Sequence, residues 1–306
     1  MNKHFIILMF SVLTLAFAVL CCNRNKEDNS AGQTILAGKA TIIADETLVP
    51  IIEDQIAVFE SEYNADITLT AKPEAEVVNA LLNDAEQVAI LSRNLTDEEK
   101  QRFSHKNIIP RITKFAVDAV AFIRNQNSND TLIALADVIS FMKGNEVENI
   151  KGLVFDNPNS STARYLAGLA GLQQVPEKNI YSFGTNTAAI KYLSENQGMV
   201  GVVGLNWLLQ PPSDIEEELQ NIAVLSVKGT NSEEYVFPTQ NSLAEGTYPL
   251  ARDLFVVNCQ GFSGLGMGFA SFVAGERGQR IILKSGLLPV RIPGRKIIIR
   301  NQINKK

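Results

Sequence analysis

Hydrophobic positions follow two alternating spacings from about residue 40 onward. Short continuous apolar runs are typical of strands buried in a sheet, and between them apolar residues recur every three or four positions, as on one helix face. The runs predict strands at 40–44, 67–70, 88–91, 115–123, 152–155, 199–203, 222–227, 235–237, 252–257 and 296–300. This alternation predicts an α/β fold in which helices pack on a sheet.

Helices are expected between most of these strands. Thr96 followed by Glu99 is a capping-box pair that marks a helix start, and Pro73-Glu74 opens another helix with proline at its beginning. The long apolar stretch at 265–283 predicts one C-terminal helix despite its glycines. The remaining helices are predicted at 48–63, 134–142, 162–172 and 187–194.

Chain length favours two lobes, because roughly 270 residues downstream of an N-terminal leader exceed one minimal core. The apolar run at 115–123 suits a strand buried on both faces or one that crosses between lobes, and we place the first lobe boundary there. The polar stretch around Gly246 suits a second crossing. The predicted organisation is a signal peptide at 1–22, a flexible tether at 23–37, lobe I at 38–117 and 238–306, and lobe II at 118–237. A cleft between two lobes is a preferred place for a small-ligand site.

The first 22 residues have the pattern of a secretory signal. A basic start precedes an uncharged apolar run at 5–20, which is short for a spanning helix. It ends at Cys21-Cys22, where a bacterial lipoprotein would carry its acylated cysteine. We favour Cys22, because cleavage before Cys21 would place the bulky Leu20 at the scissile bond; an ordinary secretory peptide is the alternative. A polar tether follows, so we expect a lipid-anchored protein of the cell envelope, periplasmic or extracytoplasmic.

Composition removes several classes of function. The formal net charge of −5 argues against a nucleic-acid surface, which needs clustered Lys and Arg. Beyond the signal only Cys259 remains, so the domain has no disulfide framework. A histidine triad or a His-rich zinc site would have to be built on His105 alone, since the other histidine lies in the signal. We therefore expect no metal, no cofactor and no catalytic residue.

Three hydroxyl-rich segments follow apolar strands and lead into helices: Asp45-Glu46-Thr47, Ser92-Arg93-Asn94 and Asn159-Ser160-Ser161-Thr162. Helix N-termini present unpaired N–H groups and partial positive charge, so hydroxyls there extend an oxyanion site. Each segment taken singly is also explained by helix capping. Arg93 adds a fork for bidentate oxyanion contact, and Arg164 lies in a first helical turn, where a cation is disfavoured unless an anion is near.

The chain resembles the phosphate-binding proteins of ABC importers, especially their lipoprotein branch in Bacteroidetes-type bacteria, from about residue 38 to the C-terminus. The resemblance rests on the order and spacing of 44–50 (ADETLVP), 89–96 (AILSRNLT), 115–121 (FAVDAVA), 159–162 (NSST) and 198–204 (GMVGVVG). It implies a two-lobed type II periplasmic-binding-protein fold whose lobes close on orthophosphate and are joined by two crossing strands.

The resemblance implies that the ligand is bound by Thr47, Leu48, Ser92, Ser160, Ser161 and Thr162. We add Arg93 because of its chemistry. Family members commonly place an acid after the serine of the second strand and an arginine before the Ser-Gly-Thr turn. Here those places hold Arg93 and Asp156, so the charges are exchanged between lobes. Glu46 and Glu74 are candidate acceptors for the proton of hydrogen phosphate, which would exclude sulfate; the alternative for both is a solvated first-turn acid.

The expected function is capture of phosphate or a related oxyanion by a monomer that delivers it to an ABC permease. No Walker motif occurs, so the ATPase would be a separate chain. One alternative is an anion sensor or scavenger on the same fold. Another is a secreted hydrolase with Ser160 or Ser161 as nucleophile, for which His105 is a poorly placed base.

Overall fold

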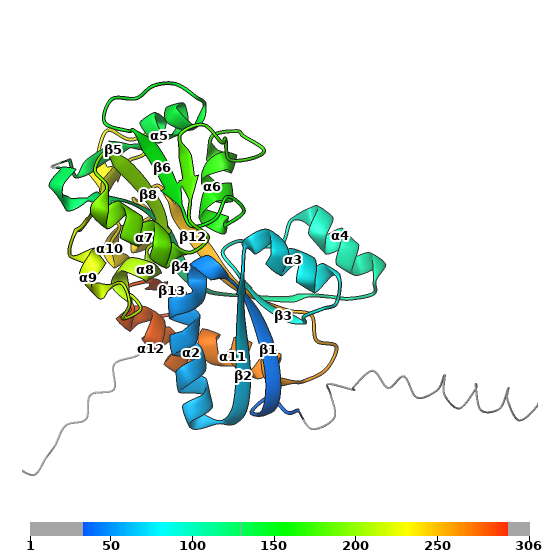
Figure 1. Ribbon diagram of the computed structural model, residues 1–306. Helices are drawn as coiled ribbons and strands as arrows, with labels where there is room; N and C mark the ends of the chain where they lie inside the picture. Colours follow the sequence, from blue (N-terminus) through cyan, green and yellow to red (C-terminus); the bar gives the residue numbers. More distant parts are fainter. Residues whose placement is uncertain (1–32, 129, 293–306) are drawn as a thin grey trace, which may run out of the picture. The chain divides into compact units, whose positions relative to one another are not determined.

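The computed structural model describes residues 33–128 and 130–292, and Figure 1 shows their arrangement. The predicted signal peptide, the acylated Cys22 or Cys21, most of the tether and the strand at 296–300 lie outside the described residues. Within the described part, no helix combines the length and the apolar character that crossing a bilayer requires. The described residues from Thr34 onward belong to one compact unit by their contacts.

The strands and helices alternate as predicted. The strands are β1 (Ala37–Asp45), β2 (Asn64–Lys72), β3 (Val88–Leu91), β4 (Arg111–Asn125), β5 (Leu132–Ala134), β6 (Gly152–Phe155), β7 (Ile180–Ser182), β8 (Met199–Gly204), β9 (Ile222–Val224), β10 (Ser226–Lys228), β11 (Tyr235–Val236), β12 (Ala251–Asn258) and β13 (Leu288–Pro289). The helices are α2 (Val49–Glu62), α3 (Glu74–Leu82), α4 (Asp97–His105), α5 (Leu135–Met142), α6 (Ser161–Leu169), α7 (Asn186–Glu195), α8 (Asn206–Leu209), α9 (Glu216–Leu219), α10 (Gln240–Ala244), α11 (Leu265–Ala274) and α12 (Glu276–Lys284), with 3-10 turns η1 (Glu46–Leu48) and η2 (Gln126–Ser128).

A mixed sheet organises the fold. Its order is β2-β1-β3-β12-β4-β8-β6-β7, with β9 and β13 beside β4, and β5, β10 and β11 form a separate small sheet. β1 is parallel to β2 and β3, whereas β12 runs antiparallel to both β3 and β4. The predicted α/β class is therefore confirmed.

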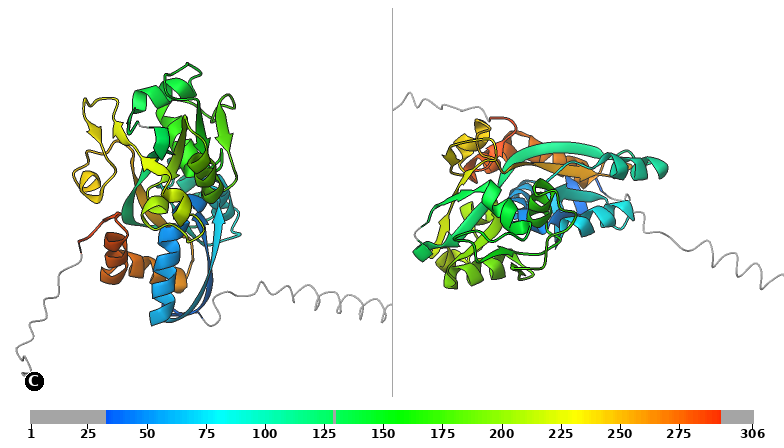
Figure 2. Two further views of the ribbon diagram at one scale, coloured as in Figure 1. Left: turned by 60° about the vertical axis from the view of Figure 1, so that its left-hand side comes forward. Right: turned by 90° about the horizontal axis from the view of Figure 1, so that it is seen from above.

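The long strand β4 belongs to both halves of the sheet. Its first part, Arg111 to Ala119, pairs with β12, and its second part, Val120 to Asn125, pairs with β8 and β9. Seen from above, β4 and β12 run side by side across the molecule (Figure 2). The nearly continuous burial of β4 explains why its sequence reads as an unbroken apolar run.

Two sequence-based boundaries were wrong. The helix predicted at 265–283 is two helices, because Gly275 takes an extended conformation (φ −82°, ψ 175°) between α11 and α12. The strand predicted at 222–227 is divided at Leu225, since β9 pairs with β4 and β10 pairs with β5 and β11. The predicted second crossing contains a short helix, α10, which starts with a capping box at Thr239 and Ser242.

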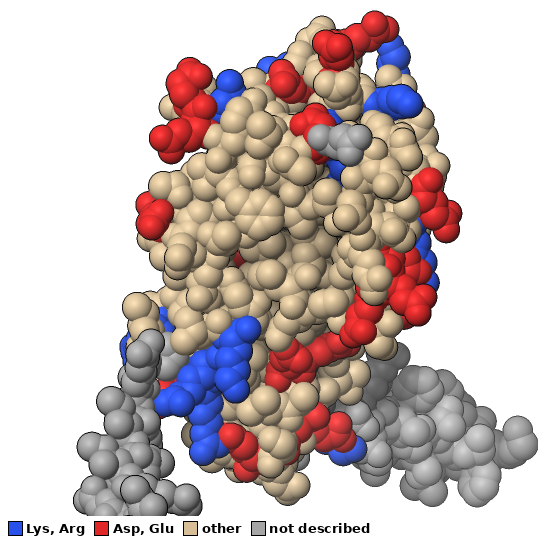
Figure 3. Space-filling model, turned by 90° about the vertical axis from the view of Figure 1, so that its left-hand side faces the viewer, with Lys and Arg blue, Asp and Glu red and all other residues tan. Residues whose placement is uncertain are grey.

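One large hydrophobic core underlies both halves of the sheet, and a second, smaller cluster packs α3 and α4 against β1, β3 and β12. Cys259 is half-buried beside the smaller cluster. The face shown in Figure 3 carries acidic and basic groups in separate places around a broad uncharged region.

Candidate anion-binding site

The first and third hydroxyl-rich segments meet at one point in the structure. Thr47 lies in η1, directly after β1, and Ser161 is the first residue of α6. Their hydroxyl oxygens are 2.8 Å apart although 114 positions separate them in the chain. Both side chains are buried, so this contact directly joins predicted lobe I to predicted lobe II.

A buried arginine that sequence reasoning did not single out joins the same point. Arg252, on β12, donates from Nη1 to Ser161 Oγ at 2.8 Å and from Nη2 to Thr47 Oγ1 at 3.1 Å. It also forms an ion pair with Asp118 of β4, with Nη2 to Oδ2 at 2.8 Å. Burial alone would lower the pKa of Arg252, but the charge and hydrogen bond of Asp118 together with the charges of Asp45 and Glu74 outweigh burial, so that pKa is raised. The guanidinium is therefore charged at every physiological pH.

A signal for this pair was present in the sequence. Asp118 interrupts the apolar run of β4, and Arg252 stands at the start of the apolar run of β12. A charged residue inside a strand that is otherwise buried needs a partner, because an isolated buried charge is very unfavourable. The signal gives no indication of which residues are paired, and β4 and β12 are far apart in the chain.

Thr47 is held on several sides. Asp45 Oδ1 accepts from the backbone N–H of Thr47 at 3.1 Å and from its hydroxyl at 3.0 Å. The carbonyl oxygen of Thr47 accepts from Asn206 Nδ2 at 2.9 Å and from Trp207 Nε1 at 3.0 Å. Trp207 is buried. Leu48 packs its side chain into the main core, so only its backbone is left to contact a ligand.

Glu74 gathers a second set of groups. Its carboxylate accepts from Arg93 Nε at 2.8 Å and from Ser92 Oγ at 3.4 Å, and it pairs with Arg164 Nη1 at 3.2 Å. The Glu74 side chain is only 4% exposed. Arg93 is further bound by Glu99, through two contacts of 2.9 Å each. Glu74 is therefore a buried carboxylate that contacts cations from both predicted lobes.

A cavity of ≈ 160 Å³ lies between these two networks. It is lined by Glu74, Ser92, Arg93, Ser161, Arg164, Tyr165 and Arg252. Ser92, Arg93, Ser161 and Glu74 were singled out from the sequence. Arg164 was noted only as a weak indication, and Arg252 and Tyr165 were missed. Several arginines and hydroxyls around a small space are chemically suited to an oxyanion.

The other predicted ligand residues serve their own segments. Ser160 is the N-cap of α6, accepting from the N–H of Ala163 at 3.4 Å, and its hydroxyl lies 3.0 Å from that of Thr162. Thr162 in turn donates to Asp156 Oδ1 at 3.5 Å. These contacts shape the start of α6 and keep Ser160 and Thr162 off the lining of the cavity.

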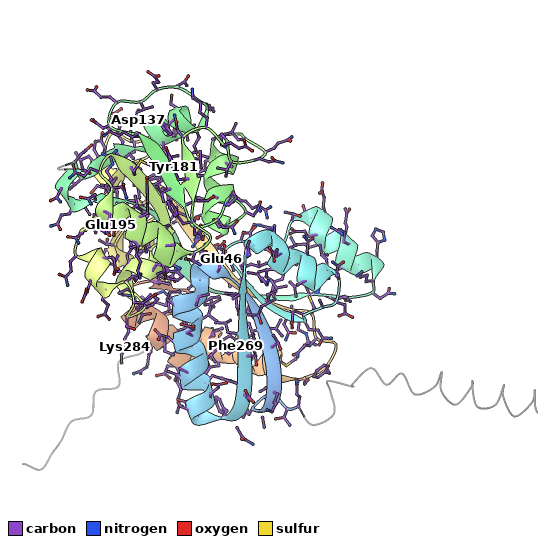
Figure 4. All side chains as sticks on the ribbon, viewed as in Figure 1. Glu46, Asp137, Tyr181, Glu195, Phe269 and Lys284 are labelled. Carbon is purple, nitrogen blue, oxygen red and sulfur yellow. The ribbon has the colours of Figure 1, made fainter. Side chains whose placement is uncertain are left out.

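Two carboxyl groups beside this turn have raised pKa values. Burial raises the pKa of Asp156 to about 6. The pKa of Glu46 rises to about 7, first because of burial and then because of repulsion by Asp156 and Asp45. Figure 4 shows Glu46 directly before α2, at the end of this helix that faces predicted lobe II. Glu46 does not line the cavity.

Neither a metal site nor a histidine base is apparent in the described part of the chain. No group of three or more Asp, Glu, Cys or His side chains there could hold a metal ion. His105 is an exposed residue at the end of α4, so it offers no base to Ser160 or Ser161. The geometry favours binding through N–H and O–H donors.

Comparison with known proteins identifies the family and the fold. The family model described as the PBP superfamily domain matches residues 29–277. The phosphate-binding protein PstS of Borreliella burgdorferi is 24% identical over 311 residues, covering 94% of this chain and 99% of the relative.

Solved structures share the fold. One is from Clostridium perfringens, described as a phosphate ABC transporter substrate-binding protein with bound phosphate (TM-score 0.68, 18% identity, 83% of this chain and 100% of the other). Another is an ABC-type phosphate transport receptor from Vibrio cholerae (TM-score 0.61, 17% identity, 82% and 100%). The type II periplasmic-binding-protein fold implied by the sequence resemblance is thereby confirmed. From its family match and its architecture, the chain belongs to the periplasmic-binding-protein (PBP) superfamily.

Proposed function

We propose that this protein captures inorganic phosphate, or a closely related oxyanion, between its lobes and delivers it to an ABC permease served by a separate ATPase. The observation that carries the proposal is the cavity of ≈ 160 Å³ lined by Arg93, Arg164 and Arg252 together with hydroxyl donors. Its relatives with matching architecture are phosphate-binding proteins by description.

Arg252 takes the central role in the proposed site. Asp118 fixes its guanidinium, and Thr47 and Ser161 bring hydroxyls from both lobes to it. This arrangement would account for the exchanged charges at Arg93 and Asp156. Family members commonly have an arginine where this chain has Asp156, and here Arg252 from β12 would supply that positive charge. Ser92 and Ser161 would donate to the anion directly, while Thr47, Leu48, Ser160 and Thr162 would act through the backbone or by positioning.

Glu74 is the better placed of the two candidate proton acceptors, because it lines the cavity and Glu46 does not. A carboxylate beside a bound anion repels it unless a proton lies between them. Hydrogen phosphate carries that proton and sulfate does not, so Glu74 would favour phosphate. Glu74 would have no catalytic role, because the anion would be bound and released unchanged.

Lobe I would comprise 38–117 and 238–306, and lobe II 118–237, with β4 and the segment before β12 as the crossings. The chain would be a monomer anchored through an acylated Cys22, or Cys21, on the extracytoplasmic side. A sensor or scavenger of the same anion is the second candidate, since binding alone does not establish transport.

Calorimetric titration tests the proposal directly. The purified protein, unfolded and refolded to remove carried anion, is titrated with phosphate and then with sulfate. We expect saturable phosphate binding, much weaker sulfate binding, and loss of phosphate binding in Arg252→Gln and Ser161→Ala. Arg102→Gln, an exposed arginine on α4, serves as a control with wild-type affinity. A folded protein that gives no heat with phosphate would refute the proposed ligand.

Transport needs a separate test. Phosphate-loaded protein should stimulate the ATPase of a reconstituted permease complex encoded with it, whereas the anion-free protein should not. Tight phosphate binding without stimulation of any such complex would favour the sensor or scavenger.

A further inference from the structure

The arginines that line the cavity differ in how many of their donors are already in use. A guanidinium has five N–H donors. Arg252 makes contacts to Asp118, Thr47 and Ser161. Arg93 donates to Glu74, to the carbonyl of Asn94 and twice to Glu99. Both line the cavity but are held in place by carboxylates, so neither is the arginine that would move when a ligand enters.

Arg164 is different. Among the described residues its guanidinium has one recorded partner, Glu74, through Nη1 at 3.2 Å, and its side chain is 45% exposed. Most of its donors therefore still face the cavity or solvent. The ion pair also crosses the cleft, because Arg164 belongs to α6 and Glu74 to α3.

The position of Arg164 in its helix adds a second argument. Arg164 lies in the first turn of α6, which begins at Ser161. The partial positive charge of a helix N-terminus disfavours a cation in that turn and favours an anion. A negatively charged partner is thus needed near the start of α6. In the present structure Glu74 supplies it from the opposite lobe.

We infer that Arg164 is an exchangeable latch: it pairs with Glu74 across the cleft while the cavity holds no anion, and transfers its guanidinium to phosphate when phosphate enters. Glu74 keeps its contact with Arg93. This inference rests on the proposed function and adds to it the residue that moves.

The exchange has a defined consequence for Glu74. Both Arg93 Nε and Arg164 Nη1 now contact the same oxygen, Oε1. Departure of Arg164 leaves Oε1 with one donor in place of two, so that this oxygen can accept the proton of hydrogen phosphate. Arg164 is half exposed, and Glu74 still has Arg93 as a partner after the exchange. The exchange therefore leaves no buried charge unpaired, and it gives Arg164 a bidentate contact with the anion.

A double-mutant cycle tests the latch. Phosphate is titrated calorimetrically into wild type, Arg164→Gln, Glu74→Gln and the double variant, with Arg102→Gln as the control and circular dichroism to establish folding. We expect Arg164→Gln to weaken phosphate binding at least tenfold and Arg102→Gln to leave it unchanged. Arg164→Lys should fall between the two, because it keeps the charge and loses the planar fork.

The decisive quantity is how much phosphate affinity Arg164→Gln removes in the wild-type background and in the Glu74→Gln background. In wild type, Arg164 must first leave Glu74, so part of its contact with the anion is offset. In Glu74→Gln that offset is absent, and the loss caused by Arg164→Gln should be several-fold larger. Equal losses in both backgrounds would mean that Arg164 binds the anion without releasing Glu74, which overturns the exchange.

Phosphate binding by wild type tests the proposed function, and phosphate binding by Arg164→Gln tests the latch. If wild type binds no phosphate, the proposed function fails and the latch with it. If wild type binds phosphate and folded Arg164→Gln binds it within twofold of wild type, the proposed function stands and the latch alone is wrong.

Discussion

Arg252 and Asp118 form a fully buried ion pair, with side chains 2% and 0% exposed. A second pair, Lys114 with Asp253, joins the same two strands at the surface, with exposures of 41% and 45%. Truncating one member of a buried pair leaves an uncompensated charge in the interior, whereas a surface pair contributes little. The chain therefore contains its own matched control for the buried pair.

We predict that Arg252→Ala lowers the free energy of unfolding by about 3–5 kcal/mol, and that Lys114→Ala lowers it by about 1 kcal/mol or less. Urea denaturation followed by circular dichroism measures both. The double variant Arg252→Met/Asp118→Leu should recover much of the stability and still bind no phosphate. Equal losses for Arg252→Ala and Lys114→Ala would contradict the assigned burial.

Glu46 should make stability depend on pH. Its pKa is about 7 in the folded protein, raised from 4.5 by burial and by repulsion from Asp156, Asp45 and Glu76, which Lys72 partly offsets. Between these values the folded state holds a proton that the unfolded state has released. The contribution of Glu46 to stability is therefore present at low pH and is lost as pH rises from about 4.5 to about 7.

Replacing Glu46 by Gln should remove this loss of folding stability at higher pH. We expect Glu46→Gln to raise the melting temperature at pH 8 and to leave it nearly unchanged at pH 4.5, as measured by thermal denaturation. Glu53→Gln is the control, because Glu53 is an exposed carboxylate of α2. A gain of equal size at both pH values would show that the ionisation of Glu46 is not the cause.

At the scale of elements, local sequence signals worked where they act within one turn. Thr96 and Glu99 form the predicted capping box at the start of α4, with both reciprocal hydrogen bonds present. The break at Gly275 was not predicted, since glycine is tolerated within helices and only packing decides whether a helix stops there. Here α12 turns back to pack against α2 and β13.

Helix α11 approaches the segment before β1 closely. A methyl group added at Gly268 would overlap the carbonyl oxygen of Ile35, whereas one at Gly261 would meet no atom within 4 Å. We predict that Gly268→Ala lowers the free energy of unfolding by about 1–3 kcal/mol, because backbone must move. Gly261→Ala should stay within about 0.5 kcal/mol of wild type. Denaturant unfolding of the two variants compares them, and similar stabilities would argue against this close packing.

At the scale of the whole molecule, binding and folding are linked. An anion that binds only the folded, closed protein stabilises it by about 2.7 kcal/mol at a concentration 100 times its dissociation constant. Phosphate should therefore raise the urea midpoint of the wild-type protein. The same phosphate concentration should leave Arg252→Gln unchanged, and sulfate should have a smaller effect on wild type. Equal stabilisation by both anions would show that Glu74 does not discriminate between them.

The sequence by itself determined the α/β class, the alternation of the main strands and helices, and the start of α4 at its capping box, because periodicity and capping act over a few neighbouring residues. It also identified Ser92, Arg93, Ser161 and Glu74, which line the cavity. Only the tertiary structure decided that Arg252 joins them and that Glu74 contacts Arg164. Those contacts exist because β12 inserts between β3 and β4 and because α6 faces α3 across the cavity. Such pairings depend on segments more than a hundred residues apart in several cases, and no local pattern encodes them.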